Sequence, residues 1–135
     1  MPLSPCPRPL TVLVVDDRPD VADSLALFLR SCCGHEAVVA YDGDAGVRAA
    51  LERRPDAVVC DLGLPGRTGF EVAQAVRRGL SRPPLLVALT AYEDEAVRGR
   101  ARWAGFDHFL VKPADPREVG AMVSGAARVP AGPAA

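Results

Sequence analysis

The sequence predicts an α/β protein, a (βα)5 doubly wound fold with five parallel strands in the order 2-1-3-4-5. Short apolar runs alternate five times with stretches of helical period. Three of these runs are continuously apolar, which is typical of strands buried on both faces of a parallel sheet. Strict alternation of strands and helices implies right-handed crossovers, with helices on both faces of the sheet.

The size and charge of the chain restrict the protein class. Its 135 residues suit one domain. We expect the folded domain at 10–127, between a flexible Pro-rich tail at 1–9 and a flexible tail at 128–135. The net charge of −1 gives no basic footprint for nucleic acid or an anionic membrane. No apolar run approaches the ~20 residues that span a bilayer, and a signal-peptide layout is absent. We therefore expect a cytoplasmic protein that binds neither nucleic acid nor membrane.

The first two strands are predicted at 10–15 (LTVLVV) and 36–40 (EAVVA). The helix between them opens at Pro19, since proline suits the first helical turn. Apolar residues share one face of this helix: Val21, Leu25, Phe28, Leu29 and Cys32. Asp42 and Gly43 mark the turn before the second helix.

The remaining strands are predicted at 57–60 (AVVC), 85–89 (LLVAL) and 107–111 (DHFLV). The helix after the third strand has an apolar face of Val72, Ala73, Val76 and Leu80. The last helix opens at Asp115, followed by a proline in the first turn and a glutamate three residues after the cap. Its apolar face consists of Val119, Met122, Val123 and Ala126.

Several side chains are interpreted as structural. Trp103 is expected to pack locally, with an interaction surface as the alternative. Cys32 and Cys33 are expected to be free thiols near a helix end. His35 and His108 have no partner implied by spacing and are expected at loop or rim positions. A solvated helix face is expected for Arg98, Arg100 and Arg102.

Polar residues follow the strands at one edge of the predicted sheet. Asp16 and Asp17 end the first strand, Asp61 the third, Thr90 the fourth and Lys112 the fifth. In such sheets ligands bind at the carboxyl ends of the strands, at the switch point between the first and third strands. Three carboxylates are therefore expected to converge where the topology places a site.

The chemistry of this set favours a metal ion and a phosphoryl group. Carboxylates side by side repel one another unless a cation lies among them. Mg²⁺ prefers oxygen ligands, keeps several waters and binds one or two carboxylates together with phosphate oxygens. Lys112 and Thr90 would hold other phosphoryl oxygens. Taken singly, each aspartate also fits a cap of the following helix, Thr90 a loop hydroxyl and Lys112 a surface charge.

Four stretches carry a resemblance to a known family: VLVVDDRPDVADSL, DLGLPGRTGFEVAQAVR, ALTAYEDEA and AGFDHFLVKPAD. They resemble the receiver domain of two-component response regulators, a CheY-like member of the flavodoxin-like folds. The resemblance covers roughly residues 10–127. The wording around Asp61 is most similar to receivers attached to hybrid sensor kinases.

The resemblance implies that Asp61 is the phosphoacceptor. Asp16, Asp17 and Asp61 are implied to hold Mg²⁺, with the backbone carbonyl of Gly63 as a further ligand. No catalytic enzyme is implied; the chain would at most phosphorylate and dephosphorylate itself in the presence of Mg²⁺.

The resemblance also implies a switch. Thr90 and Lys112 match the switch hydroxyl and the phosphate-binding lysine, and the Lys112–Pro113 peptide bond is expected to be cis. Phe109 stands where the family more often has a tyrosine whose ring rotates on activation; a fixed core aromatic is the alternative. Gly63 offers no side chain to orient water and Tyr92 would shield the phosphoryl group, so slow self-dephosphorylation is expected.

The implied partners are a sensor histidine kinase or a histidine phosphotransfer protein, and a downstream protein bound by the fourth helix, fifth strand and fifth helix. We expect a stand-alone receiver, because no room for an output domain follows residue 127. It is expected to be a monomer or a weak, phosphorylation-dependent homodimer.

Two alternative functions are a phosphohydrolase with an aspartyl nucleophile and an interaction module that is never phosphorylated. Gly63 disfavours the hydrolase, since such enzymes place a second acid at that position, and the intact polar set disfavours the module.

Overall fold

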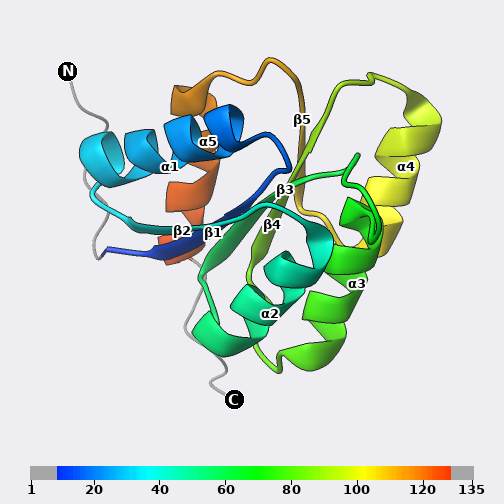
Figure 1. Cartoon of the computed structure of the whole chain (residues 1–135), viewed down its shortest axis with the longest axis horizontal. Coiled ribbons are helices and arrows are strands. Elements are labelled where there is room, and N and C mark those ends of the chain that lie inside the picture. Colours follow the sequence, from blue (N-terminus) through cyan, green and yellow to red (C-terminus); the bar gives the residue numbers. More distant parts are fainter. Residues whose placement is uncertain (1–8, 129–135) are drawn as a thin grey trace.

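A five-stranded parallel sheet lies at the centre of the computed structural model, which describes residues 9–128. Two layers of helices cover it (Figure 1). The elements in chain order are β1 (Thr11–Val15), α1 (Pro19–Cys33), β2 (Glu36–Ala40), α2 (Gly43–Arg53), β3 (Ala57–Asp61), α3 (Gly69–Gly79), β4 (Leu85–Thr90), α4 (Glu95–Ala104), β5 (His108–Val111), α5 (Pro116–Ser124) and a terminal 3-10 helix (Gly125–Arg128).

The strand order is β2-β1-β3-β4-β5, with every pair parallel, which confirms the predicted fold. Two strands extend further than predicted. Asp61 lies opposite Leu89 and Thr90 lies opposite Val111, so both polar residues belong to the ends of the strands. The backbone of the sheet therefore fixes the positions of Asp61 and Thr90.

The two helix layers bury opposite faces of the sheet. Helices α1 and α5 cover one face and α2, α3 and α4 the other (Figure 1). Residues alternate along β1, with Leu13 and Val15 facing one layer and Val12 and Val14 the other. Burial on both faces explains why β1, β3 and β4 are continuously apolar in sequence.

The helix starts follow short-range capping rules. The Asp42 side chain accepts a hydrogen bond from the Ala45 N–H at 2.8 Å and caps α2. Asp115 caps α5, as predicted, by accepting from the Arg117 N–H at 2.9 Å. Helix α3 has a reciprocal capping box between its cap and its third residue, Thr68 and Glu71.

The buried face of α1 is rotated slightly from the predicted one. Its buried residues are Ala22, Leu25, Ala26 and Leu29, whereas Cys32 is exposed and Val21 is half-buried. Small alanines form the centre of the contact because they allow the helix to approach the sheet closely. Cys32 is a free, exposed thiol in the last turn of α1, as expected, and Cys33 is half-buried beside it.

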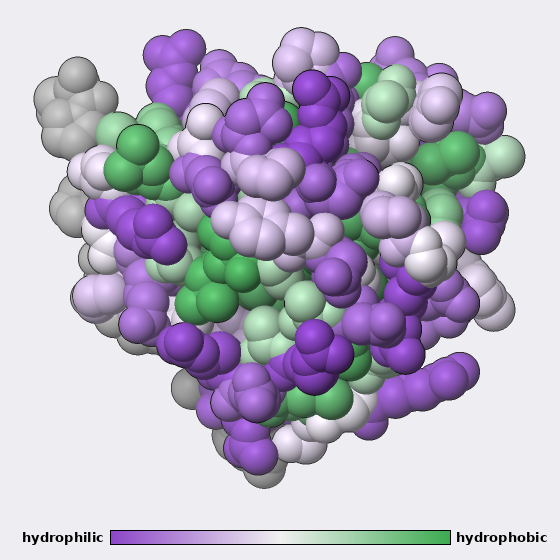
Figure 2. Space-filling view, viewed as in Figure 1, coloured by the Kyte–Doolittle hydropathy of each residue, from purple (hydrophilic) through white to green (hydrophobic). Residues whose placement is uncertain are grey.

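One structural interpretation from the sequence is wrong, because Trp103 does not pack locally and is 88% exposed. His35 lies in the loop between α1 and β2, as expected, but it is buried, with Nδ1 accepting a hydrogen bond from the Leu10 N–H at 3.2 Å. The outer surface over α2 and α3 mixes hydrophilic side chains with smaller hydrophobic areas (Figure 2).

No helix within residues 9–128 combines the length and apolar character needed to cross a membrane. The tails predicted at 1–9 and 128–135 lie almost entirely outside the described residues.

Candidate functional site

The three predicted carboxylates meet at the carboxyl ends of β1 and β3. Asp16, Asp17 and Asp61 each offer one carboxylate oxygen, and these oxygens lie within 4.8 Å of one another. Asp16 is 1% exposed, Asp61 is buried and Asp17 is exposed. The predicted convergence is confirmed, and it places one deep and one shallow acid around Asp61.

Hydrogen bonds from nearby backbone N–H groups orient two of these carboxylates. The Arg18 N–H donates to Oδ1 of Asp16 at 3.0 Å, and the Gly63 N–H donates to Oδ1 of Asp61 at 3.1 Å. Neither aspartate caps the following helix, because the cap positions of α1 and α3 are Arg18 and Thr68. The cap interpretation of the aspartates therefore does not apply, and their remaining oxygens face the cluster.

The backbone packs closely behind the central acid. A Cβ built on Gly69, the first residue of α3, would lie 2.4 Å from the Asp61 carbonyl oxygen. Glycine is therefore needed at this position. The Cys60 thiol donates to the same carbonyl at 3.4 Å, and burial raises the pKa of this thiol. Cys60 is thus a neutral packing residue rather than a metal ligand.

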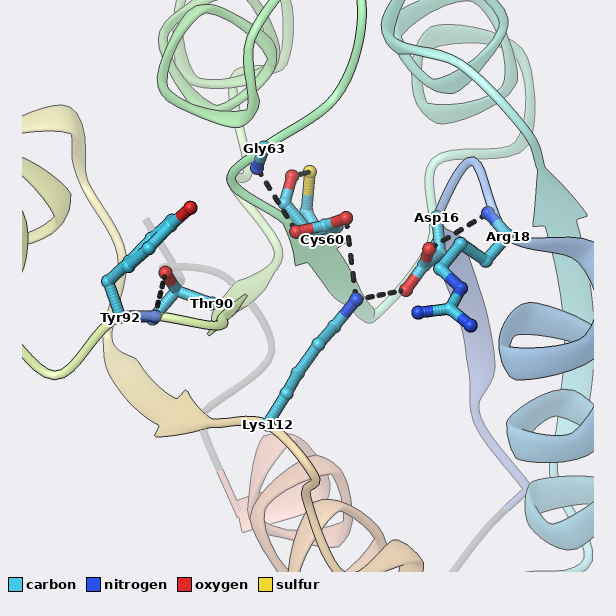
Figure 3. Close-up of polar contacts among 8 residues, drawn as sticks. Asp16, Arg18, Cys60, Gly63, Thr90, Tyr92 and Lys112 are labelled. Carbon is cyan, nitrogen blue, oxygen red and sulfur yellow. Dashed lines mark hydrogen bonds and ion pairs between the residues drawn. The ribbon is translucent and has the colours of Figure 1, made fainter.

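A cation completes the cluster. Lys112, the single lysine in the sequence, places its ammonium 2.9 Å from Oδ2 of Asp16 and 3.4 Å from Oδ2 of Asp61. Figure 3 shows the side chain of Lys112 reaching across the site to Asp16. Burial lowers the pKa of Lys112, but the hydrogen bond with Asp16 and the charge of Asp61 outweigh it and leave this pKa raised. The ammonium therefore stays charged between two carboxylates.

The Lys112–Pro113 peptide bond, directly after β5, is cis. The Lys112 N–H donates to the Thr90 carbonyl at 2.7 Å and continues the pairing of β4 with β5. The lysine is thus held on the ladder while its side chain extends into the site.

Thr90 and Tyr92 form the opposite rim. The buried Thr90 hydroxyl oxygen accepts a hydrogen bond from the Tyr92 N–H at 3.1 Å. The Tyr92 side chain is 70% exposed, and its ring extends from this turn toward the side of Gly63 in Figure 3. A Cβ built on Gly63 would meet only Oδ1 of Asp61, at 3.8 Å, so the space beside the central acid is open.

Phe109 on β5 is neither fully buried nor free. It is half-buried, and the guanidinium of Arg98 on α4 lies over its ring at 4.6 Å from the centroid. Arg98 thus keeps 37% of its side chain exposed and also contacts Phe109. Sequence reasoning missed this contact because no local spacing relates residue 98 to residue 109.

The donor chemistry at the site fits a hard divalent cation. Three carboxylates supply only oxygen, which Mg²⁺ prefers, and the nearest thiol is held in its neutral form. Asp16, Asp17 and Asp61 would hold the ion. The N–H of Gly63 donates a hydrogen bond to Asp61. The carbonyl of Gly63 stays a proposed metal ligand.

Comparison with known proteins agrees with this geometry. The family model described as the response regulator receiver domain matches residues 12–124. A protein of Chloroflexus aurantiacus J-10-fl, assigned as a response regulator, is 32% identical with a TM-score of 0.78, covering 90% of this chain and 99% of that one. The signal receiver domain of NarL from Mycobacterium tuberculosis is 28% identical with a TM-score of 0.79, covering 91% and 99%. The chemotaxis response regulator CheY4 of Vibrio cholerae is 25% identical with a TM-score of 0.78, covering 88% and 99%.

Proposed function

Since the chain belongs to the response regulator receiver family, we propose that Asp61 accepts a phosphoryl group from a phosphohistidine. The donor would be a sensor histidine kinase or a histidine phosphotransfer protein. The observation that carries the proposal is the cluster itself, three acids within 4.8 Å beside the ammonium of Lys112. Receiver domains are generally phosphoacceptor switches rather than catalytic enzymes.

The transfer is a displacement at phosphorus. One carboxylate oxygen of Asp61 forms a bond to phosphorus, the P–N bond of phosphohistidine breaks, and the imidazole nitrogen leaves with the electron pair and takes up a proton. The Gly63 N–H holds the other Asp61 oxygen and so orients the nucleophile. Lys112 binds a phosphoryl oxygen with the ammonium that faces Asp61.

Mg²⁺ bound by Asp16, Asp17 and Asp61, with the Gly63 carbonyl as a proposed further ligand, would neutralise the charge of the phosphoryl group. Without a cation, the negative charges of the three carboxylates would repel the phosphoryl group. Asp16 is already paired with Lys112, and the exposed Asp17 leaves one side of the cluster open to solvent.

The signal is a change of charge at a rigid edge of the sheet. An acyl phosphate on Asp61 carries nearly two negative charges in place of the single charge of the carboxylate, within reach of the Thr90 hydroxyl. We propose that Thr90 then bonds to the phosphoryl group and that Phe109 moves toward the space left behind. The surface of α4, β5 and α5 would carry this change to a downstream protein. A monomer or a weak, phosphorylation-dependent homodimer is part of this proposal.

The lifetime of the phosphorylated state is proposed to be long. Gly63 presents no side chain to orient an attacking water, and the exposed Tyr92 ring stands at the rim where it would shield the phosphoryl group. We also propose a cytoplasmic site of action, which suits the free thiol of Cys32.

The proposal is tested by intact-mass measurement. The protein is incubated with Mg²⁺ and a small phosphodonor such as phosphoramidate, which is a nitrogen-linked phosphoryl group like phosphohistidine. One added phosphoryl group is expected in the unmodified chain and in Asp44→Asn, a control at an exposed aspartate of α2. None is expected in Asp61→Asn or without Mg²⁺. Equal phosphorylation of Asp61→Asn would overturn the assignment.

A further inference from the structure

A groove lies between α3 and α4, which pack side by side on the sheet face away from α1 and α5. Its volume is about 230 Å³. The residues that line it are Phe70, Gln74, Gly99, Arg100, Trp103 and Ala104. None of the proposed phosphorylation residues borders it, so the groove is a separate feature of the molecule.

Trp103 is the unusual side chain of this groove. It is the sole tryptophan of the sequence, and 88% of its surface is exposed. Helix α4 buries the small residues Ala101 and Ala104, which turns the indole outward beside the groove. A tryptophan carries a large apolar surface and is among the residues most enriched at the centre of protein interfaces.

Guanidinium groups flank the groove. The guanidinium of Arg100 lies over the Phe70 ring at 4.2 Å from its centroid. Arg77 on α3 donates to the Gly105 carbonyl, at the C-terminal end of α4, at 3.5 Å. Both contacts hold a cation along the seam between the helices, and both arginines are exposed residues.

The charge of this region is opposite to that of the whole chain. Helices α3 and α4 contain five arginines and two glutamates, whereas the chain has a net charge of −1. Glu71 is engaged in the capping box with Thr68, and Glu95 lies 3.9 Å from Arg98. The carboxylates of these helices thus lie at their N-terminal turns, whereas Arg100 lines the groove and Arg77 flanks it.

We propose that this groove binds an acidic segment of a partner protein. An apolar side chain of the segment packs against Trp103, and its aspartates or glutamates pair with Arg100 and Arg77. Charge complementarity selects an anionic partner, and the apolar groove selects a protein segment rather than a nucleic acid, because one exposed indole does not form a stacking platform. The binding needs no phosphoryl group, so its failure would leave the proposal for Asp61 intact.

Trp103 is also the reporter for the test. Four peptides of equal length with blocked termini are compared. Two are acidic and two are basic, and one peptide of each pair contains leucine and phenylalanine. The acidic apolar peptide is expected to bind saturably and to move the Trp103 emission to shorter wavelength. The other three are expected to bind about tenfold more weakly, a difference of ~1.4 kcal/mol.

Two variants alter the groove and two matched variants control for them. Gly99→Glu places a carboxylate in the groove, where a built Cβ meets nothing within 4 Å, and replaces a helical glycine, so folding is preserved. Arg100→Glu reverses one cation. Both are expected to weaken binding about tenfold, as is Trp103→Ala when a labelled peptide is followed by anisotropy. Arg48→Glu on α2 and Leu27→Ala on α1, both exposed, are expected to bind like the unmodified chain.

Several results would overturn the proposal. One is equal binding of the basic and acidic apolar peptides, or no saturable binding of the acidic one. A second is tighter binding of single-stranded DNA that is lost in the groove variants, which would make the ligand a nucleic acid. A third is a dimer of the protein alone that dissociates in Trp103→Ala, which would make the occupant a second copy of the chain.

Discussion

The ammonium of Lys112 lies 2.9 Å from Oδ2 of Asp16, a carboxylate that is almost completely buried. A buried carboxylate is costly unless a cation or hydrogen bonds compensate it, and Asp16 has both, from Lys112 and from the Arg18 N–H. The same ammonium reaches Asp61. The arrangement of the acids and the proposed binding of a phosphoryl group therefore both depend on Lys112, which pairs with Asp16 and Asp61 before any phosphoryl group binds.

Replacing this cation tests its structural role. Lys112→Met leaves Asp16 buried beside Asp61 without the ammonium, and we expect the free energy of unfolding to fall by about 2 kcal/mol in the absence of Mg²⁺. Millimolar Mg²⁺ should stabilise the variant more than the unmodified chain, because the ion no longer competes with the ammonium. Urea unfolding with and without Mg²⁺ measures both effects.

Arg48→Met is the control for Lys112→Met. It removes an exposed cation from α2 and should change the free energy of unfolding by less than about 0.5 kcal/mol. The same Mg²⁺ response in Lys112→Met and the unmodified chain would contradict the account.

The lifetime of the acyl phosphate depends on the open space beside Asp61. A Cβ built on Gly63 meets only Oδ1 of Asp61 at 3.8 Å, so an asparagine fits there and offers an amide to orient water. We expect Gly63→Asn to accelerate loss of the phosphoryl group about tenfold, or ~1.4 kcal/mol of activation free energy. Decay of radiolabelled protein after removal of the donor gives the rate.

Tyr92 is tested in the same assay. Tyr92→Ala removes the exposed ring from the rim and is expected to speed the decay further, since water then reaches the phosphoryl group more freely. Tyr41→Ala removes an equally polar ring from the end of β2 and serves as the control. Loss of label within seconds from the unmodified chain, or no acceleration in Gly63→Asn, would refute slow self-dephosphorylation.

Arg98 and Phe109 form a second long-range pair, across the seam of α4 and β5. A guanidinium over an aromatic ring at a partly exposed site contributes about 0.5–1 kcal/mol. A double-mutant cycle with Arg98→Ala and Phe109→Leu should return a coupling energy of that size by urea unfolding. The coupling should decrease when beryllofluoride and Mg²⁺ occupy the site, because ring movement would separate the pair. An unchanged coupling would support Phe109 as a fixed aromatic.

The buried His35 gives stability a pH dependence. Burial lowers the pKa of this imidazole below its ordinary value of 6.5, although the charge of Asp56 opposes the shift. The unfolded chain then binds a proton at a higher pH than the folded chain. The stability from the neutral ring is therefore fully present above about pH 6.5 and is lost as the pH falls toward the folded pKa.

Urea unfolding between pH 7.5 and pH 5 measures this loss. His35→Gln keeps an acceptor for the Leu10 N–H but does not titrate, so its stability should fall less over the same range. His108 remains in both proteins and acts as an internal control. Identical pH dependence of the two proteins would exclude His35 as the group responsible.

The acid cluster could be predicted because parallel strands end at one edge of a sheet. Asp16 follows β1 and Asp61 ends β3; these strands are neighbours in the sheet, so the rule needs only the strand order. Lys112 and Thr90 follow the same rule from β5 and β4. The resemblance to receivers then supplied chemical roles that the rule alone does not assign.

Side-chain directions on the helices could not be predicted in the same way. The outward position of Trp103 follows from the burial of Ala101 and Ala104, and small residues give a weaker pattern in the sequence than large apolar ones. The contact of Arg98 with Phe109 and that of His35 with Leu10 join elements that are distant in the sequence. These contacts depend on the rotation and depth of each helix against the sheet.

The central claim is that Asp61 becomes an acyl phosphate, and chemical reduction locates that bond most directly. Borohydride converts an aspartyl phosphate into homoserine, and peptide mass spectrometry reads the modified position after phosphorylation in Mg²⁺. The account predicts homoserine at residue 61 and none at 16 or 17. Conversion at another aspartate, or none in protein shown by intact mass to be phosphorylated, would contradict it.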